Sequence, residues 1–306
     1  MKVKVRVPSS TANLGPGFDI FGAALCLYNT FEAKYVPNAK KTTFIIKGEG
    51  KKTLDLGKKN LLWQSMQETF NVLKETKYNL NNLNITINNN IPLSGGLGSS
   101  STAIVGGIML ANALCENKLD KSQIASLAIK IEGHPDNVIP AIFGGLCICS
   151  KDENENHGTV INLPIPKLKV ILCVPSFELR TRRSRQILPK MVDINDVVFN
   201  MSRVALLAAA FCCADYSLLR QAMQDKLHQP YRGKMIPVMN EVLQAALNAK
   251  AFGAFLSGSG PTLAALCDKK DANNVQKTMK NVWAAESVSV KTYILDFDVK
   301  GATIII

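Results

Sequence analysis

The feature that most constrains this chain is a run of small residues between a strand-like segment and a long apolar one. Seven of the eight residues from Ser94 to Ser101 are Gly or Ser. Leu83–Ile87 before them alternates like a strand, and Ala103–Leu114 after them is apolar and rich in Ala and Gly, which predicts a buried helix. Small residues let backbone N–H groups approach a ligand, and a helix N-terminus adds free donors and partial positive charge. The segment therefore predicts an anion site.

The whole loop, Pro92–Thr102, lacks the signatures of two common phosphate loops. No GK[ST] follows it, as a Walker loop requires, and it does not satisfy the GxGxxG of dinucleotide sites. A Gly-rich turn with a Ser helix cap, which needs no ligand, remains an alternative. Gly106 and Gly107 inside the predicted helix each cost about 1 kcal/mol in helix propensity. They predict that another element packs very close to that helix.

Composition bounds the class of protein. The chain has 306 residues, of which 47% are hydrophobic and 20% charged, and its net charge is +12. It is therefore globular, about two domains long, and attracts anions of any kind. The longest apolar run, Val204–Ala214, is shorter than the roughly 20 residues that a membrane helix needs, and the alternating first eight residues predict a strand and not a signal peptide. These two segments predict a protein without membrane contact. The eight cysteines lack zinc-site spacing, which favours reduced thiols in a cytoplasmic protein.

Strands and helices intermix with hairpin-like spacing along the whole chain, which favours an α+β fold over a doubly wound parallel sheet. The most polar stretch is Lys151–Gly158, which reads as a surface turn, and Pro164 and Pro166 follow it. We therefore expect two domains, at 1–165 and 166–306. Helices are also expected at Ser217–Leu227 and Ile236–Ala249.

Further loops could carry chemistry. Pro8–Asp19 is rich in Gly and Pro, and Glu132–Asn137 holds two acids, a His and an amide within six residues, in a segment that we expect to be a loop. Arg180–Arg185 contains four Arg in six residues, which suits either a solvated surface or a carboxylate or phosphate clamp. Tyr231–Lys234 is a second basic segment, and Ser257–Pro261 is a second tight Gly loop.

Together these loops resemble one family. The segments PxxxGLGSS at 92–100, PSSTANLGPGFD at 8–19 and SGSGPT at 257–262 are similar to the three signature motifs of the GHMP kinases. Within that superfamily, the segments at 132–145, 184–190 and 230–237 resemble homoserine kinases in particular. The resemblance implies a two-domain GHMP kinase fold, with a ribosomal-protein-S5-like N-terminal domain and a ferredoxin-like C-terminal domain, and an active cleft between them.

The resemblance also implies an activity, transfer of the γ-phosphoryl group of ATP to the side-chain hydroxyl of L-homoserine. The products are O-phospho-L-homoserine and ADP, in threonine biosynthesis from aspartate. The implied ATP-binding residues are Asn60 and the loop residues Pro92, Leu93, Ser94, Gly95, Gly96, Leu97, Gly98, Ser99, Ser100, Ser101 and Thr102. Ser100 and Glu132 are the implied ligands of Mg²⁺, which prefers hard oxygen donors.

The implied homoserine-binding residues provide a check against chemistry. They are Asn13, Asp19, His134, Thr181, Arg185 and Arg232. The substrate is a zwitterion, so its carboxylate calls for Arg and its ammonium group for a carboxylate and amide acceptors. The set contains both charges. A mevalonate-type acid has no ammonium group and less use for Asp19, which favours an amino-acid alcohol.

Asn137 and Arg185 are the predicted catalytic residues. Asn137 stands where several GHMP kinases have an Asp base, and an amide cannot serve as a general base. Phosphoryl transfer has a loose transition state, so positioning and charge stabilisation can dominate. The hypothesis is that the substrate hydroxyl, oriented by Asn137, attacks directly and loses its proton late, to the phosphate.

Three alternatives stay open at this point. One is a kinase for another small alcohol. Another is a nucleic-acid-binding module, suggested by the charge and the Arg run, but aromatic residues are only 7% and none alternates with basic residues as base stacking would need. The last is a hydrolase built on Ser99 and His134, for which no GxSxG elbow exists. We expect homoserine and ATP as partners, with neither nucleic acid nor membrane. Homodimers are common among homoserine kinases, although no segment marks an interface.

Overall fold

The computed structural model describes residues 1–39, 41–75, 77–78, 80–150, 159–179 and 181–305. The polar stretch Lys151–Gly158, predicted to be a surface turn, and Arg180 of the basic run lie outside these residues.

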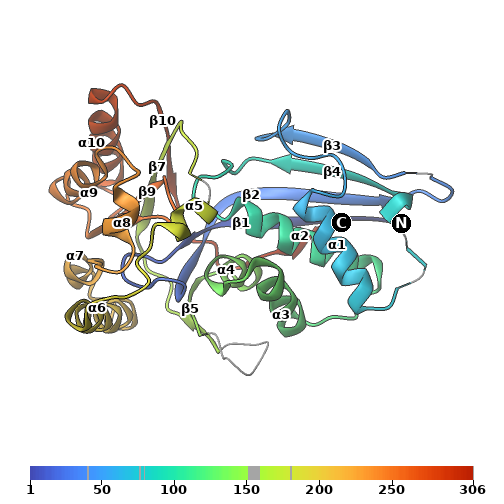
Figure 1. The fold of residues 1–306 in the computed structure, drawn as a ribbon, viewed down its shortest axis with the longest axis horizontal. Helices are drawn as coiled ribbons and strands as arrows, with labels where there is room; N and C mark the ends of the chain where they lie inside the picture. Colours follow the sequence, from blue (N-terminus) through green and yellow to red (C-terminus); the bar gives the residue numbers. More distant parts are fainter. Residues whose placement is uncertain (40, 76, 79, 151–158, 180, 306) are drawn as a thin grey trace.

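The first half of the chain forms most of a seven-stranded sheet (Figure 1). Its strands are β1 (Lys2–Ala12), β2 (Phe21–Tyr35), β3 (Thr43–Gly48), β4 (Leu83–Asn89), β5 (Leu146–Cys149), β6 (Val160–Leu163) and β11 (Thr303–Ile304). The main path runs β11-β1-β2-β4-β3, and β5 pairs with β2 and with β6. All pairs are antiparallel except β3 with β4. The register of β11 pairs Val5 with Ile304, so the end of the chain completes the sheet of the first domain.

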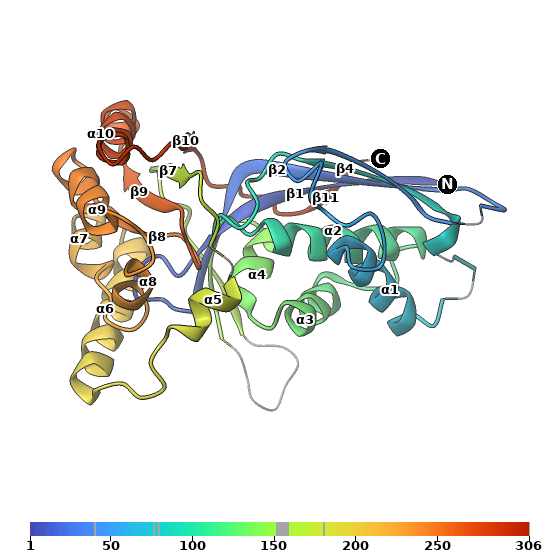
Figure 2. The same ribbon diagram turned by 45° about the horizontal axis from the view of Figure 1, so that its top comes forward.

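Four helices cover one face of this sheet, as Figure 2 shows. They are α1 (Leu61–Val72), α2 (Ser99–Leu114), α3 (Lys121–Glu132) and α4 (Pro135–Phe143), and a short 3-10 turn, η1 (Leu80–Asn82), precedes β4. The close packing predicted for the glycines of α2 is confirmed. A Cβ on Gly106 would lie 2.4 Å from the Phe31 ring, and one on Gly107 would lie 2.6 Å from the carbonyl oxygen of Leu62.

The second half of the chain forms a four-stranded antiparallel sheet in the order β10-β7-β9-β8. Its strands are β7 (Lys169–Pro175), β8 (Gly253–Leu256), β9 (Leu263–Cys267) and β10 (Val290–Leu295). This is the 4-1-3-2 order of a ferredoxin-like sheet. The helical elements of this half are α5 (Thr181–Gln186), α6 (Ile194–Cys212), η2 (Tyr216–Leu218), α7 (Leu219–Ala222), α8 (Gln229–Gly233), α9 (Met239–Asn248) and α10 (Ala272–Ala285). The chain passes from one sheet to the other between β6 and β7 and returns to the first sheet at β11.

A shared apolar core joins the two halves. Leu14, Phe21 and Leu97 of the first half are buried in one cluster with Leu172 and Phe255 of the second. Leu14 and Leu97 belong to the loops 8–19 and 92–102, in which the sequence predicts ligand-binding residues. The shared core therefore holds these loops in place relative to the second half.

The structure corrects three predicted elements. The segment 133–137 is not all loop, because α4 begins at Pro135, and Pro is favoured at the first helical position. The helix expected at 217–227 ends at Ala222. The one expected from Ile236 starts only at Met239, because Pro237 disfavours helical backbone at the residue before it.

By length and composition alone, α6 is the one helix among the described residues that could cross a membrane. Leu207, Ala210 and Phe211 on one side of α6 are buried in the domain core. Ile194, Val198 and Met201 on another side are exposed. The helix thus packs as an element of the second domain and leaves an apolar stripe uncovered.

Candidate active site

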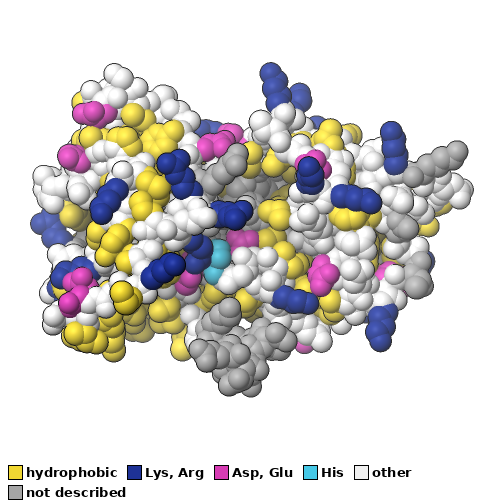
Figure 3. Space-filling model, viewed as in Figure 1, with side chains coloured by type: hydrophobic (Ala, Val, Ile, Leu, Met, Phe, Trp, Pro, Cys, Tyr) yellow, Lys and Arg dark blue, Asp and Glu magenta, His cyan; other side chains and the backbone are white. Residues whose placement is uncertain are grey.

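The predicted site residues meet in a cavity of about 280 Å³ between the two halves. In Figure 3 the centre of the face is hollowed and shows a histidine among acidic and basic side chains. The cavity is lined by every residue predicted to bind homoserine or Mg²⁺, by Asn137, and by most of the predicted ATP loop. These lining residues are Asn13, Asp19, Ser94, Gly95, Gly96, Gly98, Ser99, Ser100, Ser101, Glu132, His134, Asn137, Thr181, Arg185 and Arg232.

A second cavity, of about 290 Å³, adjoins the first and is more apolar. Leu61, Ser94, Ser99 and Ser100 line both cavities, so the Gly/Ser loop lies between them. The walls of the second cavity include the apolar side chains of Phe31, Leu54, Ile87 and Leu93 and the amide of Asn60. Asn60 also caps α1, since its Oδ1 accepts from the N–H of Leu62 at 3.0 Å. An apolar hollow with a few fixed polar groups suits a flat aromatic base.

The backbone of the Gly/Ser loop is fixed by close neighbours. Gly96 and Gly98 have positive φ, and a Cβ would lie 2.2 Å from the carbonyl oxygen of Ser257 in the first case and 2.1 Å from Ser10 Oγ in the second. Gly98 is the N-cap of α2, so the N-terminus of a long helix opens at the cavity. Backbone donors and the positive end of the helix therefore face the place where an anion would lie.

Three residues of the predicted ATP loop do not line either of these cavities. Leu97 is buried, and its carbonyl accepts from the N–H of Ser10 at 3.2 Å. Thr102 is buried too, and its hydroxyl donates to the carbonyl of Ser99 at 2.7 Å. Pro92 borders a different hollow, on the β10 side of the loop. Their contacts hold the loop in shape, and the sequence alone could not distinguish them from the lining residues.

Oxygen ligands suited to a divalent cation meet where α2 and α3 approach. The hydroxyl of Ser101 donates to Oε1 of Glu132 at 2.8 Å, and Ser100 lines the same cavity. Burial raises the pKa of Glu132, and the charge of His134 and the bond from Ser101 only partly oppose it. A buried carboxylate with so little compensation would gain from a cation beside it, so these residues fit Mg²⁺ chemically.

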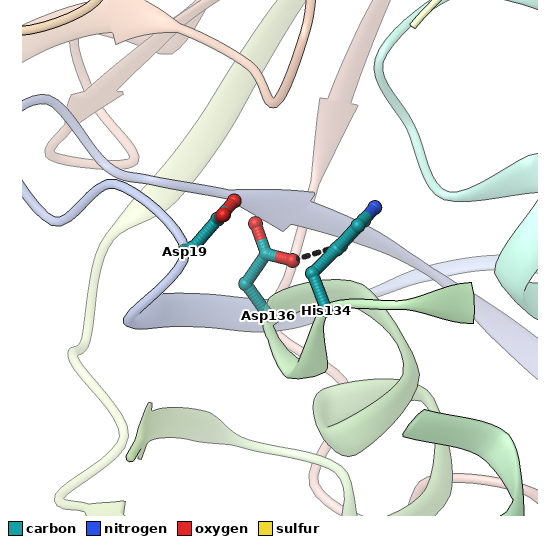
Figure 4. A group of neighbouring side chains, drawn as sticks. All are labelled: Asp19, His134 and Asp136. Atoms are coloured by element: carbon teal, nitrogen blue, oxygen red, sulfur yellow. Dashed lines mark hydrogen bonds and ion pairs between the residues drawn. The ribbon is translucent and has the colours of Figure 1, made fainter. Parts of the chain in front are cut away.

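Figure 4 shows a second group, Asp19, His134 and Asp136, with one ligand atom of each within 4.8 Å of the others. His134 Nδ1 donates to Oδ1 of Asp136 at 2.5 Å. Burial acts to lower the pKa of His134, but the bond to Asp136 and the charges of Asp136 and Glu132 outweigh it and raise that pKa. Sequence reasoning missed Asp136 as a site residue, although it lies within the 132–137 motif. A cluster of acids of this kind can hold a metal ion or a protonated amine.

Asp19 already has a cationic partner within the chain. Its two carboxylate oxygens accept from Nη1 and Nη2 of Arg185 at 2.9 and 2.7 Å. This hydrogen-bonded pairing raises the pKa of Arg185 further. Asp19 and Asn13 both have positive φ, a conformation that Asp and Asn tolerate better than other residues. The amide of Asn13 accepts from the N–H of Asp19 at 3.1 Å and donates to the carbonyl of Gly258 at 2.9 Å, which joins loops of both domains.

Arg232 is a buried cation without a carboxylate partner. It is 2% exposed, and no ion pair among the described residues includes it. Its Nε donates to the carbonyl of Ser184 at 3.3 Å and its Nη1 to that of Gly258 at 3.0 Å. Burial, followed by the charge of Arg185, lowers the pKa of Arg232 to about 10. The charges of Asp19, Asp136 and Asp225 oppose this only in part, so an anionic ligand in the cavity would stabilise Arg232 further.

Phe18 lies between the two arginines. Its ring centroid is 5.5 Å from the guanidinium carbon of Arg185 and 5.1 Å from that of Arg232. At these distances the aromatic ring stabilises both cations. Sequence reasoning did not single out Phe18, because only the folded chain places the two arginines around it.

Asn137 is held from both sides. Its Oδ1 accepts from Ser10 Oγ at 3.0 Å, and its Nδ2 donates to Oδ1 of Asp136 at 3.4 Å. Thr181 lines the same cavity, and its hydroxyl is 3.2 Å from that of Ser259. The site thus combines an anion-binding loop, paired opposite charges, an unpaired buried cation and a fixed amide.

Two family models match the chain. The model of the GHMP kinase N-terminal domain matches residues 60–145, and that of the GHMP kinase C-terminal domain matches residues 206–285. A mevalonate kinase structure from Methanococcus jannaschii, only 16% identical, shares the fold with a TM-score of 0.73 over 96% of this chain and 98% of its own. The chain therefore belongs to the GHMP kinases, and the predicted α+β, two-domain fold is confirmed.

More similar relatives narrow the group. A homoserine kinase from Desulfitobacterium hafniense is 40% identical over 99% of this chain and 100% of its own length. A crystal structure of homoserine kinase from Cytophaga hutchinsonii is 28% identical and superposes with a TM-score of 0.90 over 99% of this chain and 97% of that one. Within the GHMP kinases, this chain is a member of the homoserine kinase group.

Proposed function

We propose that the protein is an ATP:L-homoserine O-phosphotransferase, which makes O-phospho-L-homoserine and ADP in threonine biosynthesis. One observation carries the proposal. The buried, unpaired cation Arg232 and the carboxylate of Asp19 line the same cavity as the helix N-terminus of the Gly/Ser loop. The ligands that satisfy all three are a carboxylate, an ammonium group and a phosphate group, which an amino acid and a nucleoside triphosphate bring together within one small volume.

The α-carboxylate of homoserine is proposed to lie against Arg232 and Arg185, and its ammonium group against Asp19, Asn13 and His134, with Thr181 at the rim. The Asp19–Arg185 pair offers a route for this binding. The carboxylate of a bound zwitterion can take the place of Asp19 beside Arg185, and its ammonium group can take the place of Arg185 beside Asp19. Neither side chain is then left with an unpaired charge in a partly buried place.

ATP is proposed to lie with its base in the apolar cavity beside Asn60 and its phosphates over the backbone of residues 94–101. The shared lining of the two cavities supports this, because the loop lies between the cavity proposed for the adenine base and the cavity proposed for homoserine. Ser100, Glu132 and the adjacent Ser101 would hold Mg²⁺, which neutralises phosphate charge when it is bound. Omission of Mg²⁺ should abolish turnover, and Glu132→Gln should raise the Mg²⁺ concentration needed for half-maximal rate. An unchanged Mg²⁺ requirement in that variant would contradict the assignment.

In the proposed reaction, the homoserine oxygen forms a bond to the γ-phosphorus while the bond from that phosphorus to the β–γ bridging oxygen breaks. Asn137 orients the attacking hydroxyl, and its own amide is fixed by Ser10 and Asp136. The hydroxyl proton leaves late, to an oxygen of the transferred phosphoryl group. Arg185 and the loop donors stabilise the charge that develops.

Turnover by purified protein with Mg-ATP tests the function. Homoserine, mevalonate and shikimate are compared, and only homoserine should give rapid ADP release. Arg185→Gln should lower kcat/KM for homoserine strongly, whereas Arg183→Gln, an exposed position on the same helix, should not. No turnover on homoserine, or equal turnover on mevalonate, would overturn the proposal.

We also propose that the protein is a cytoplasmic homodimer that pairs through α6. The exposed stripe of Ile194, Val198 and Met201 has helical spacing, and the apolar side chains at the lower left of Figure 3 lie over α6. All eight cysteines are free thiols, as expected of a reducing compartment. Light scattering should give twice the chain mass, and Met201→Glu should shift it to the monomer, while Asn274→Glu, at an exposed position on α10, should not. A monomeric wild-type protein would refute the dimer.

A further inference from the structure

A buried histidine outside the cavity wall connects two parts of the substrate site. His228 lies just before α8 and is fully buried. Its Nε2 donates to the carbonyl of Gly15 at 2.7 Å, and its Nδ1 is 3.2 Å from Nη1 of Arg232. Its ring stacks on Phe18, with centroids 5.3 Å apart. One side chain thus contacts the arginine, the aromatic ring beside it and the loop that ends in Asp19.

The partners of His228 fix its protonation state. A guanidinium group only donates hydrogen bonds, so Nδ1 must carry a lone pair. A carbonyl only accepts them, so Nε2 must carry the proton. Only the neutral ring with its proton on Nε2 satisfies both. Burial, which lowers the pKa of His228, acts in the same direction, although Asp225 Oδ2 lies 3.5 Å from Nε2 and opposes it.

Asp225 is itself occupied by backbone and amide donors. Its oxygens accept from the N–H groups of Leu227, His228 and Gln229 at 2.9, 3.0 and 2.6 Å. They also accept from Asn200 Nδ2 at 2.9 Å. Asp225 therefore holds the start of α8, and with it His228, in place. It has little remaining capacity to take the proton from Nε2.

On its other side His228 is hydrogen-bonded to the backbone at Gly15, in a segment that is closely packed. The carbonyl of Gly15 accepts from His228, and that of Pro16 accepts from Asn200 Nδ2 at 3.3 Å. Gly15 has φ +91°, and a Cβ there would lie 2.5 Å from the carbonyl oxygen of Met223. Side chains of the second domain thus anchor the loop of the first domain that carries Asn13 and Asp19.

We propose that His228 is a positioning residue for the amino-acid substrate, which fixes Arg232 and the Asp19 loop at the spacing that a carboxylate and an ammonium group on one carbon require. The inference rests on the proposed function. His228 takes one N–H of Arg232 Nη1, while Gly258 and Ser184 take others. No described residue is hydrogen-bonded to Nη2, so that nitrogen is left for a carboxylate.

The test separates the two bonds of His228. His228→Phe keeps a ring against Phe18 and removes both bonds. His228→Asn restores an acceptor near the position of Nδ1, and His228→Gln restores a donor near that of Nε2. For the Phe variant we expect the KM for homoserine to rise about tenfold or more, the effect of losing one hydrogen bond to a charged group. The KM for ATP should change by less than about twofold. The Asn variant should recover most of the loss, because it restores the contact to Arg232.

A substrate analogue supplies a readout that a general loss of packing would not move. The analogue 3-amino-1-propanol is homoserine without its carboxylate. If His228 acts through Arg232, the Phe variant should lose the preference for homoserine over the analogue, with little change in kcat/KM for the analogue. Val275→Ala, a buried change in α10 away from the cavity, is the control and should leave that preference intact.

The outcomes separate the two proposals. If the wild-type enzyme does not phosphorylate homoserine, the proposed function fails. If it does, but the Phe variant keeps the wild-type preference or changes both KM values in parallel, only the role of His228 fails. Should the Phe variant not fold, the Asn and Gln variants carry the same comparison. Nitrogen NMR of the wild-type ring gives a further check, because a proton on Nδ1 at neutral pH would overturn the inference.

Discussion

Replacing Asn137 with Asp tests whether the enzyme lacks a catalytic base or does not need one. Nδ2 of Asn137 lies 3.4 Å from Oδ1 of Asp136. A carboxylate at that position would therefore bring two negative charges to about 3.4 Å. At an effective dielectric constant of about 20 their repulsion is roughly 5 kcal/mol, which corresponds to roughly three to four pKa units. One of the two carboxyl groups would then keep its proton at neutral pH, and little free base would be gained.

We therefore expect kcat of Asn137→Asp, measured at saturating Mg-ATP and homoserine between pH 6 and about 9, to be no higher than that of the wild type. The double variant Asp136→Asn, Asn137→Asp is the matched control, because it moves the single carboxylate to position 137 without a repelling neighbour. Asp136→Asn alone gives the cost of emptying position 136. A gain of about 10²-fold in either variant with Asp at 137, the effect of a general base, would refute direct attack without a base.

Three further predictions follow from the geometry of the site. Arg232→Gln should raise the KM for homoserine about 10- to 100-fold, since hydrogen bonds to charged groups contribute about 1.5–3 kcal/mol, and steady-state kinetics should show the KM for ATP nearly unchanged. Gly98→Ala should lower the melting temperature and weaken ATP binding, because the new Cβ would lie 2.1 Å from Ser10 Oγ. Gly133→Ala is the control, since Gly133 also has positive φ but a Cβ there would meet no atom within 4 Å, and it should lower the melting temperature only slightly. Burial lowers the pKa of His228, so at low pH the unfolded chain binds a proton that the folded chain does not. The free energy of unfolding should therefore fall as pH drops below about 6.5, by up to about 1.4 kcal/mol per pH unit. Denaturant titrations should show this part of the slope missing in His228→Gln, and an unchanged slope would contradict the buried neutral ring.

Most of the residues predicted to bind the substrate lie within short motifs that resemble segments of a known family. Asn13, Asp19, His134, Arg185 and Arg232 come from four separate segments, and the structure brings all of them to one cavity. The resemblance selected them, and charge provided a check, since a zwitterion needs both signs. Their individual roles in binding and catalysis stay predictions until the variants are measured.

What the sequence could not predict depends on neighbours that are distant along the chain. Phe18 acquires its role only because Arg185 and Arg232 fold onto its ring. The packing of His228 against Gly15 joins residues 213 positions apart. Local propensity also misplaced the helix at 217–227, because Asp225 takes the N–H groups of Leu227, His228 and Gln229 as acceptor and so favours a turn there.

The pairing of β11 with β1 has a consequence for how this enzyme is made. Residues 298–302 also bind the segment around α4, since the carbonyl of Asp298 accepts from the N–H of Gly145 and that of Ala141 accepts from the N–H of Ala302. Together with β11, these residues follow every other described helix and strand along the chain. During synthesis the first domain therefore keeps one edge of its sheet open, and the helix that carries Asp136 and Asn137 gains these supports only after residues 298–304 have left the ribosome. A nascent chain should thus acquire competence for phosphoryl transfer only after residues 298–304 have emerged, and not when its nucleotide-binding half emerges.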